Sequence, residues 1–134
     1  MLFTFGRNRT GMMLQPNDLD RQFMQAAISL ARQAPLIGEV PIAALLVRNG
    51  IVIARAHNRR ETDQDPTAHA ELLVIREAAR QTNSWRLTES TLYVTLEPCT
   101  MCIGAIVLAR IPRLVFGALD PKAGACGSIM DIPS

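Results

Sequence analysis

Four side chains in two short segments have the types and spacing to bind a metal ion and to move protons. His69 and Glu71 lie two residues apart, and Cys99 and Cys102 form a Cys-x-x-Cys pair later in the chain. An imidazole and two thiolates are one ligand short of a closed structural zinc site, so this set predicts a catalytic zinc whose fourth position is left to water. Glu71 would be near enough to handle the protons of that water. We therefore expect one zinc ion per chain, with Glu71 as its acid–base partner.

Other interpretations of the cysteine pair stay open from the residues alone. A redox dithiol would explain Cys99 and Cys102 but would leave His69 and Glu71 without a purpose. A structural zinc would need a fourth ligand, and His57 is the one other histidine. Because His57 follows a predicted strand, we expect it to be an edge residue with ordinary hydrogen bonds. A catalytic metal uses all four side chains and is therefore preferred.

Composition sets broad limits on the kind of protein. A chain of 134 residues with 49% hydrophobic content suits a single domain, residues 1–134, in which we expect residues 1–16 to be a flexible tail. No apolar run is long enough for a membrane-spanning helix or a secretory signal, so we expect a cytoplasmic protein without membrane contact. The net charge of +2 does not by itself indicate a nucleic-acid binder. We expect Cys126, the third cysteine, to be a small buried residue.

Hydrophobic periodicity and turn residues predict the first half of the fold. Asn17 and Asp18 can cap a helix that begins near Leu19 and that Pro35 ends. Two apolar runs, 41–47 and 51–54, are joined at Asn49-Gly50, which is a strong signal for an antiparallel hairpin. Strands this apolar indicate a sheet covered on both faces.

The second half carries the candidate ligands. A helix is predicted to start about Pro66, with Thr67 as its cap and with His69 and Glu71 in its first turn. Residues 92–96 form a strand, Cys99 opens a helix that runs to Arg110, and residues 114–117 form the next strand. This strand–helix–strand unit predicts a parallel crossover that contains the Cys-x-x-Cys helix. The fold class is thus α/β with a mixed sheet.

Three longer blocks carry a resemblance to a known family. Residues 65–71 (DPTAHAE), 93–102 (YVTLEPCTMC) and 116–128 (FGALDPKAGACGS) resemble the bacterial tRNA-specific adenosine deaminases of the cytidine/deoxycytidylate deaminase superfamily. The likeness runs from about Leu19 to Asp131, and His-x-Glu followed by Pro-Cys-x-x-Cys is the ligand pattern of zinc nucleobase deaminases. It implies a cytidine deaminase-like, three-layer α/β/α fold. It also implies a cytoplasmic homodimer that converts adenosine to inosine at the wobble position of a tRNA anticodon loop.

The resemblance also implies roles for particular residues. His69, Cys99 and Cys102 would be the zinc ligands and Glu71 the proton shuttle. The implied substrate-binding residues are Asn58, Ala70, Glu39, Asp120 and Lys122, with Pro41 bordering the pocket beside Glu39. Asn58 would bond the target nucleotide, and Asp120 would lie near the ribose of a neighbour, where a carboxylate can accept from a 2′-hydroxyl. The basic side chains near these positions could contact phosphates: Lys122, Arg113, Arg59 and Arg60.

The chain also departs from the family pattern. Relatives continue past the Gly-Ser block into another strand and a helix that grips the anticodon loop, whereas this sequence stops at Ser134. We therefore expect an exposed sheet edge and weakened contact with whole tRNA, and Leu119, where many relatives have a basic residue, points the same way. Two other functions stay open: a deaminase of free guanine or cytosine bases or nucleosides, and a catalytically silent zinc-containing subunit that binds RNA.

Overall fold

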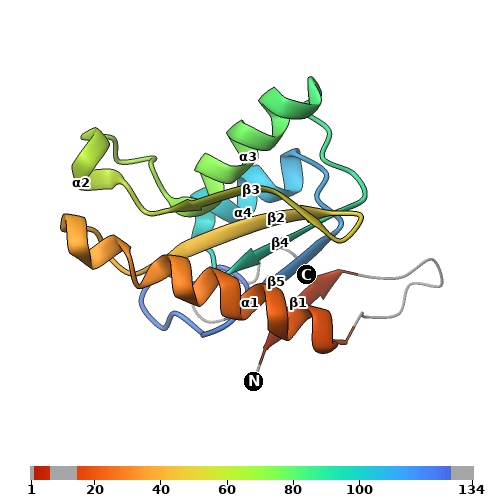
Figure 1. The fold of residues 1–134 in the computed structure, drawn as a ribbon, viewed down its shortest axis with the longest axis horizontal. Helices are drawn as coiled ribbons and strands as arrows, with labels where there is room; N and C mark the ends of the chain where they lie inside the picture. Colours follow the sequence, from red (N-terminus) through yellow and green to blue (C-terminus); the bar gives the residue numbers. More distant parts are fainter. Residues whose placement is uncertain (1, 7–14, 128–134) are drawn as a thin grey trace.

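The computed structural model describes residues 2–6 and 15–127. The strands are β1 (Phe3–Gly6), β2 (Ala43–Arg48), β3 (Ile51–His57), β4 (Ser90–Val94) and β5 (Arg113–Phe116). The helices are α1 (Asp18–Ala31), the short 3-10 helix η1 (Ala34–Ile37), α2 (Arg60–Asp63), α3 (Ala70–Thr82) and α4 (Thr100–Leu108). A five-stranded sheet in the order β1-β5-β4-β2-β3 lies between α1 on one face and α3 with α4 on the other (Figure 1). The expected three-layer α/β/α arrangement is confirmed.

Two apolar clusters hold the layers together on opposite faces of the sheet. On one face, α3 and α4 pack against side chains of the central strands, including Leu46, Leu92 and Phe116. On the other face, α1 packs against Leu45, Tyr93 and Val115. Each side chain named for one face is the sequence neighbour of one named for the other face, as in Leu45 and Leu46. This follows because successive side chains of a strand point to opposite faces of the sheet. The central strands are therefore covered on both sides, as their apolar sequences predicted.

The predicted antiparallel hairpin and parallel crossover are both present. Strands β2 and β3 pair antiparallel around Asn49 and Gly50, which have φ values of +53° and +74°. Strands β4 and β5 pair in parallel and are connected through α4. The sheet is thus mixed. The carboxyl end of β4 leads directly into the segment that bears the two cysteines.

The first helix begins as predicted but ends earlier. Asn17 and Asp20 form a reciprocal capping box, in which each side chain accepts the backbone N–H of the other at 2.9 Å. The helix ends at Ala31, four residues before the predicted stop at Pro35. Pro35 instead lies in the first turn of η1, where its missing N–H leaves no hydrogen bond unmade.

The expectation of a flexible tail over residues 1–16 is wrong for residues 3–6. These residues form β1, which pairs antiparallel with β5 so that Phe3 lies opposite Phe116. The rings of Phe3 and Phe5 stack on Phe116, with centroids 5.2 and 6.4 Å away. Residues 7–14 of the expected tail lie outside the described residues. Strand β1 therefore covers one edge of β5.

Candidate active site

The three predicted ligands lie together at one end of the sheet. His69 Nδ1 is 3.7 Å from Cys99 Sγ and 3.5 Å from Cys102 Sγ. One ligand atom from each residue lies within 4.8 Å of the other two, and among the described residues this trio is the group with the spacing of a metal site. His57 is not part of it, and its Nδ1 instead lies 2.8 Å from the backbone oxygen of Asn58. The trio thus has the donor set of an open zinc site.

Helix α3 begins later than the sequence predicted, whereas α4 follows directly from Cys99, as predicted. His69 and Cys99 are the N-cap residues of α3 and α4, with extended backbones at φ −79° and −78°. The predicted start near Pro66 is wrong because Asp65 Oδ1 accepts both the backbone N–H and the hydroxyl of Thr67, which makes a separate turn before the helix. Both caps nevertheless direct their side chains to the same point.

Glu71 lies in the first turn of α3 and is almost fully buried, at 4% exposure. Burial raises the pKa of its carboxyl, because the charged form is poorly solvated there. The nearby His69 and a hydrogen bond with Cys102 partly offset this rise. A carboxyl group whose protonated form is favoured in this way is suited to holding a proton during a reaction.

The two cysteines differ in their electrostatic environment. Hydrogen bonds from Cys102 and His69 lower the pKa of the Cys99 thiol to about 3. The hydrogen bond to Cys99, together with burial, raises the pKa of Cys102. Cys99 in turn raises the pKa of His69. The protonation of Cys99 therefore depends on both of the other ligands, and binding of a metal ion would displace the protons that the ligands carry.

These residues open onto a pocket of about 510 Å³. His69, Glu71 and Cys99 are among the residues that line it. The remaining lining comes from the segment after β3, from the approach to β2, from the end of the β4 segment and from the segment after β5: Asn58, Arg60, Val40, Ile42, Leu96, Glu97, Asp120, Lys122 and Ala123. The structure thus brings Asn58, Asp120 and Lys122 to the pocket that holds the metal trio.

The Asn58 side chain is buried and already uses one of its polar atoms. Its Oδ1 accepts the backbone N–H of Arg60 at 3.0 Å, and the Asn58 residue is 3% exposed. This bond fixes the carboxamide orientation, so its two N–H donors are the groups left for other partners. Asn58 can therefore donate to an acceptor atom of a bound base or sugar.

Two predicted substrate-binding residues are not among the residues that line this pocket. Ala70 is fully buried in the first turn of α3. Glu39 is 4% exposed, and its carboxylate accepts the backbone N–H groups of Glu61 and Thr62 and the hydroxyl of Thr62. Burial would raise the pKa of Glu39, but these hydrogen bonds outweigh it and lower the pKa. Glu39 thus holds α2 in place, and the substrate contacts of Glu39 and Ala70 stay predictions.

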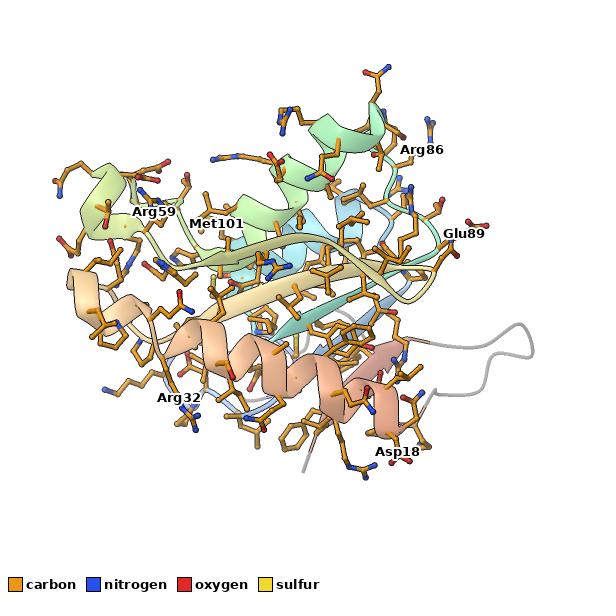
Figure 2. All side chains as sticks on the ribbon, viewed as in Figure 1. Asp18, Arg32, Arg59, Arg86, Glu89 and Met101 are labelled. Carbon is orange, nitrogen blue, oxygen red and sulfur yellow. The ribbon has the colours of Figure 1, made fainter. Side chains whose placement is uncertain are left out.

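Two of the candidate phosphate-binding arginines already have acidic partners. Arg113 is 11% exposed and binds Asp20 at 2.6 Å. Arg59, labelled in Figure 2, forms an ion pair with Asp63 at 3.0 Å beside α2. Arg60 and Lys122 line the pocket instead. They are the better placed of the four cations for a substrate phosphate.

Sequence reasoning gave no role to Glu97, the buried carboxylate just before Pro98. The residue is 2% exposed and accepts two backbone N–H groups from the segment after β5. The sequence did hold a signal for such a role, namely the position of Glu97 between an apolar strand and a predicted ligand. A charged side chain in such a place is rarely buried without hydrogen-bond partners. Those partners come from a distant segment, which the sequence pattern does not identify.

Comparisons with known proteins agree with this geometry. The chain matches the family model of the MafB19-like deaminases over residues 17–132. It is 57% identical over 113 residues to the tRNA-specific adenosine deaminase of Bacillus subtilis (strain 168), covering 84% of this chain and 70% of that protein. A solved structure from a study of A-to-I editing by tRNA:A34 deaminases at the wobble position of transfer RNA is similar, with a TM-score of 0.78 and 54% identity over 81% of this chain and 83% of that one. Guanine deaminase from Bacillus subtilis is similar with a TM-score of 0.72 and 34% identity, over 84% and 71% of the two chains.

Proposed function

Because the chain belongs to the tRNA-specific adenosine deaminase family, with the cytidine deaminase-like fold, we propose that it converts adenosine to inosine at the wobble position of a tRNA. One observation supports this above the others. In a chain 57% identical to such an enzyme, His69, Cys99 and Cys102 converge beside the buried carboxyl of Glu71. The reaction is hydrolytic: water adds its oxygen to C6 of the adenine ring, and the C6–N bond breaks to release ammonia.

The residues present fit a zinc ion. His69, Cys99 and Cys102 would hold it, because an imidazole and two thiolates are ligands that zinc favours. When bound, zinc supplies the Lewis acidity that makes water a nucleophile near neutral pH. One zinc per chain follows from the single trio in the described residues.

Glu71 is the group that moves protons. Its carboxylate accepts a proton from the attacking water and passes it to N1 of the adenine ring. It then takes the second proton from the oxygen added at C6 and gives it to the departing amine, which leaves as ammonia. Burial favours its protonated form, so the proton can be held between these steps. This role needs both forms of the side chain during one turnover, which is why a raised pKa suits it.

The pocket walls provide the contacts that orient the nucleotide. Asn58 donates from its amide to a base or sugar acceptor, because its oxygen is taken by Arg60. Asp120 accepts from a ribose hydroxyl, a group that DNA lacks. Lys122 and Arg60 bind phosphates of the RNA backbone, a role supported by their place in the pocket lining. The substrate is thus an RNA loop with an accessible adenosine.

The protein acts on a tRNA anticodon loop as a homodimer in the cytoplasm. The exposed apolar side chains of helix α4 are an argument for the dimer. Met101, Val107 and Leu108 are between 37% and 68% exposed. Apolar side chains grouped on one helix are often covered by a partner. Within the described residues, no helix has the length and apolarity to cross a membrane.

The test is to incubate zinc-loaded protein with a hairpin RNA that carries adenosine at the wobble position, and to measure inosine by nucleoside analysis. Free guanine and cytosine are assayed in parallel, because the likeness to guanine deaminase makes a free-base deaminase the second candidate. Inosine in the hairpin with no product from free bases supports the proposal. Deamination of guanine alone would overturn it, and RNA binding without any product would indicate a silent subunit.

A further inference from the structure

Glu97 carries a buried carboxylate that the proposed proton transfers do not use. It lies two residues before Cys99, at the end of the segment that leads from β4 into α4, and is 2% exposed. Its Oε1 accepts the backbone N–H of Asp120 at 3.0 Å, and its Oε2 accepts that of Cys126 at 2.8 Å. One side chain therefore binds both ends of the segment that follows β5.

The segment 118–126 is shaped around this carboxylate. The backbone N–H of Glu97 donates to Ala118 O at 2.8 Å, and that of Ala125 donates to Pro98 O at 2.9 Å. At Gly124 a Cβ atom would lie 2.3 Å from Glu97 Cδ, so the backbone approaches the carboxyl more closely than any larger residue allows. The carboxylate thus fills the inside of the loop.

The same segment forms one wall of the pocket. Asp120, Lys122 and Ala123 line the pocket that Asn58 and Arg60 also line. Asp120 also stiffens the turn, because its Oδ1 accepts the backbone N–H groups of Lys122 and Ala123 at 3.0 and 3.3 Å. The wall is therefore held by hydrogen bonds to two carboxylates, those of Asp120 and Glu97.

We propose that Glu97 is a positioning residue that fixes the Asp120–Ala123 wall relative to the metal ligand Cys99. The chain continues from Glu97 through Pro98 into Cys99, the N-cap of α4, so the carboxylate and the ligand move together. Hydrogen bonds from amides to a buried carboxylate are among the stronger ones in proteins. Substrate affinity in the pocket therefore depends on Glu97, although Glu97 itself need not touch the nucleotide. This inference rests on the proposed function.

The test uses Glu97→Gln in the zinc-loaded chain, with Glu77→Gln as the matched control. Glutamine has one acceptor oxygen, so its amide nitrogen would face one of the two backbone N–H donors. Glu77 is a residue of α3 whose side chain is 41% exposed and pairs with Arg80, so it undergoes the same chemical change away from the pocket. On the hairpin RNA we expect Glu97→Gln to raise KM about tenfold and to change kcat less than about threefold, as loss of a ground-state contact does. The zinc content stays at one ion per chain.

A second variant changes the loop and leaves Glu97 intact. Gly124→Ala places a methyl group against the carboxyl, so it displaces the same wall and raises KM in the same direction. Its effect and that of Glu97→Gln should not add in the double variant, since both break one contact. Additive effects would overturn the inference.

The outcomes separate this inference from the proposed function. If the unmodified chain makes no inosine, the proposed function fails. If it makes inosine while Glu97→Gln matches Glu77→Gln, or lowers kcat with KM unchanged, the positioning role is wrong. If the Glu97 variant does not fold, amide hydrogen exchange of the unmodified protein decides. Protection of the Asp120 and Cys126 amides beyond that of Lys122 supports the role, and equal exchange overturns it.

Discussion

The ion pair between Asp20 and Arg113 offers a substitution whose cost follows from the structure. The Asp20 side chain is 1% exposed and binds two guanidinium N–H groups at 2.6 Å each. It also accepts the Tyr93 hydroxyl at 2.6 Å, so it joins α1 to β4 and β5. Asp20→Asn keeps the size of the side chain but leaves the charge of Arg113 buried without its counter-ion.

We expect Asp20→Asn to lower the free energy of unfolding by about 3–5 kcal/mol, the usual cost of removing one partner of a buried ion pair. The control is Asp18→Asn in the same turn of α1, where the side chain is 96% exposed and projects into solvent (Figure 2). Its exposed pair with Arg21 should contribute less than about 1 kcal/mol. Urea unfolding of the zinc-loaded variants, followed by circular dichroism, measures both. Equal losses in the two variants would refute the reasoning.

The pH dependence of stability gives a second test of the Asp20–Arg113 ion pair. Burial would raise the pKa of Asp20, but hydrogen bonds from Arg113, from Tyr93 and from the Asn17 backbone outweigh it and hold the pKa below its ordinary value. A carboxyl whose pKa is lower in the folded state stabilises the fold above its unfolded pKa of about 4, and this contribution is lost as pH falls through the folded pKa. The difference between the unmodified chain and Asp20→Asn should stay constant from about pH 7 to pH 5 and shrink below about pH 4. A difference that grows on acidification would contradict the ion-pair account.

Three further predictions concern the site and the hairpin. Glu71→Gln should lower kcat on the hairpin RNA by about 10²–10⁴-fold, because it removes the group that carries the proton, while Glu77→Gln has little effect. The zinc content and the urea midpoint of the Glu71 variant should not change. A rate close to that of the control would show that Glu71 is not the proton carrier. Cys102→Ala should lower bound zinc well below one per chain by atomic absorption, whereas Cys126→Ala should retain it; equal zinc in both variants would remove Cys102 from the ligand set. Gly50→Ala should lower the free energy of unfolding by about 1 kcal/mol, because a φ of +74° is strained for a residue with a Cβ. The added Cβ would itself meet no neighbouring atom within 4 Å, so backbone strain is the whole cost. An unchanged urea midpoint would contradict this.

Local sequence patterns were sufficient for part of the site. The types and order of His69, Glu71, Cys99 and Cys102 predicted a metal site, and the structure places these four side chains around one point. This works because both pairs are close in sequence and each pair is carried by the start of a helix. The start of α3 was misplaced, since the turn made by Asp65 competes with helix formation and hydrophobic periodicity does not reveal such a turn.

The sequence by itself determined the hairpin, the parallel crossover and the candidate ligands, because each depends on neighbours within a few residues. The tertiary structure alone decided that Phe3–Gly6 pairs with β5, that Glu39 holds α2 and that Glu97 holds the loop bearing Asp120. In each of these cases the partner is far away in the chain. A strand edge or a buried carboxylate accepts whichever N–H groups the completed fold presents to it, and no local pattern records which ones those will be.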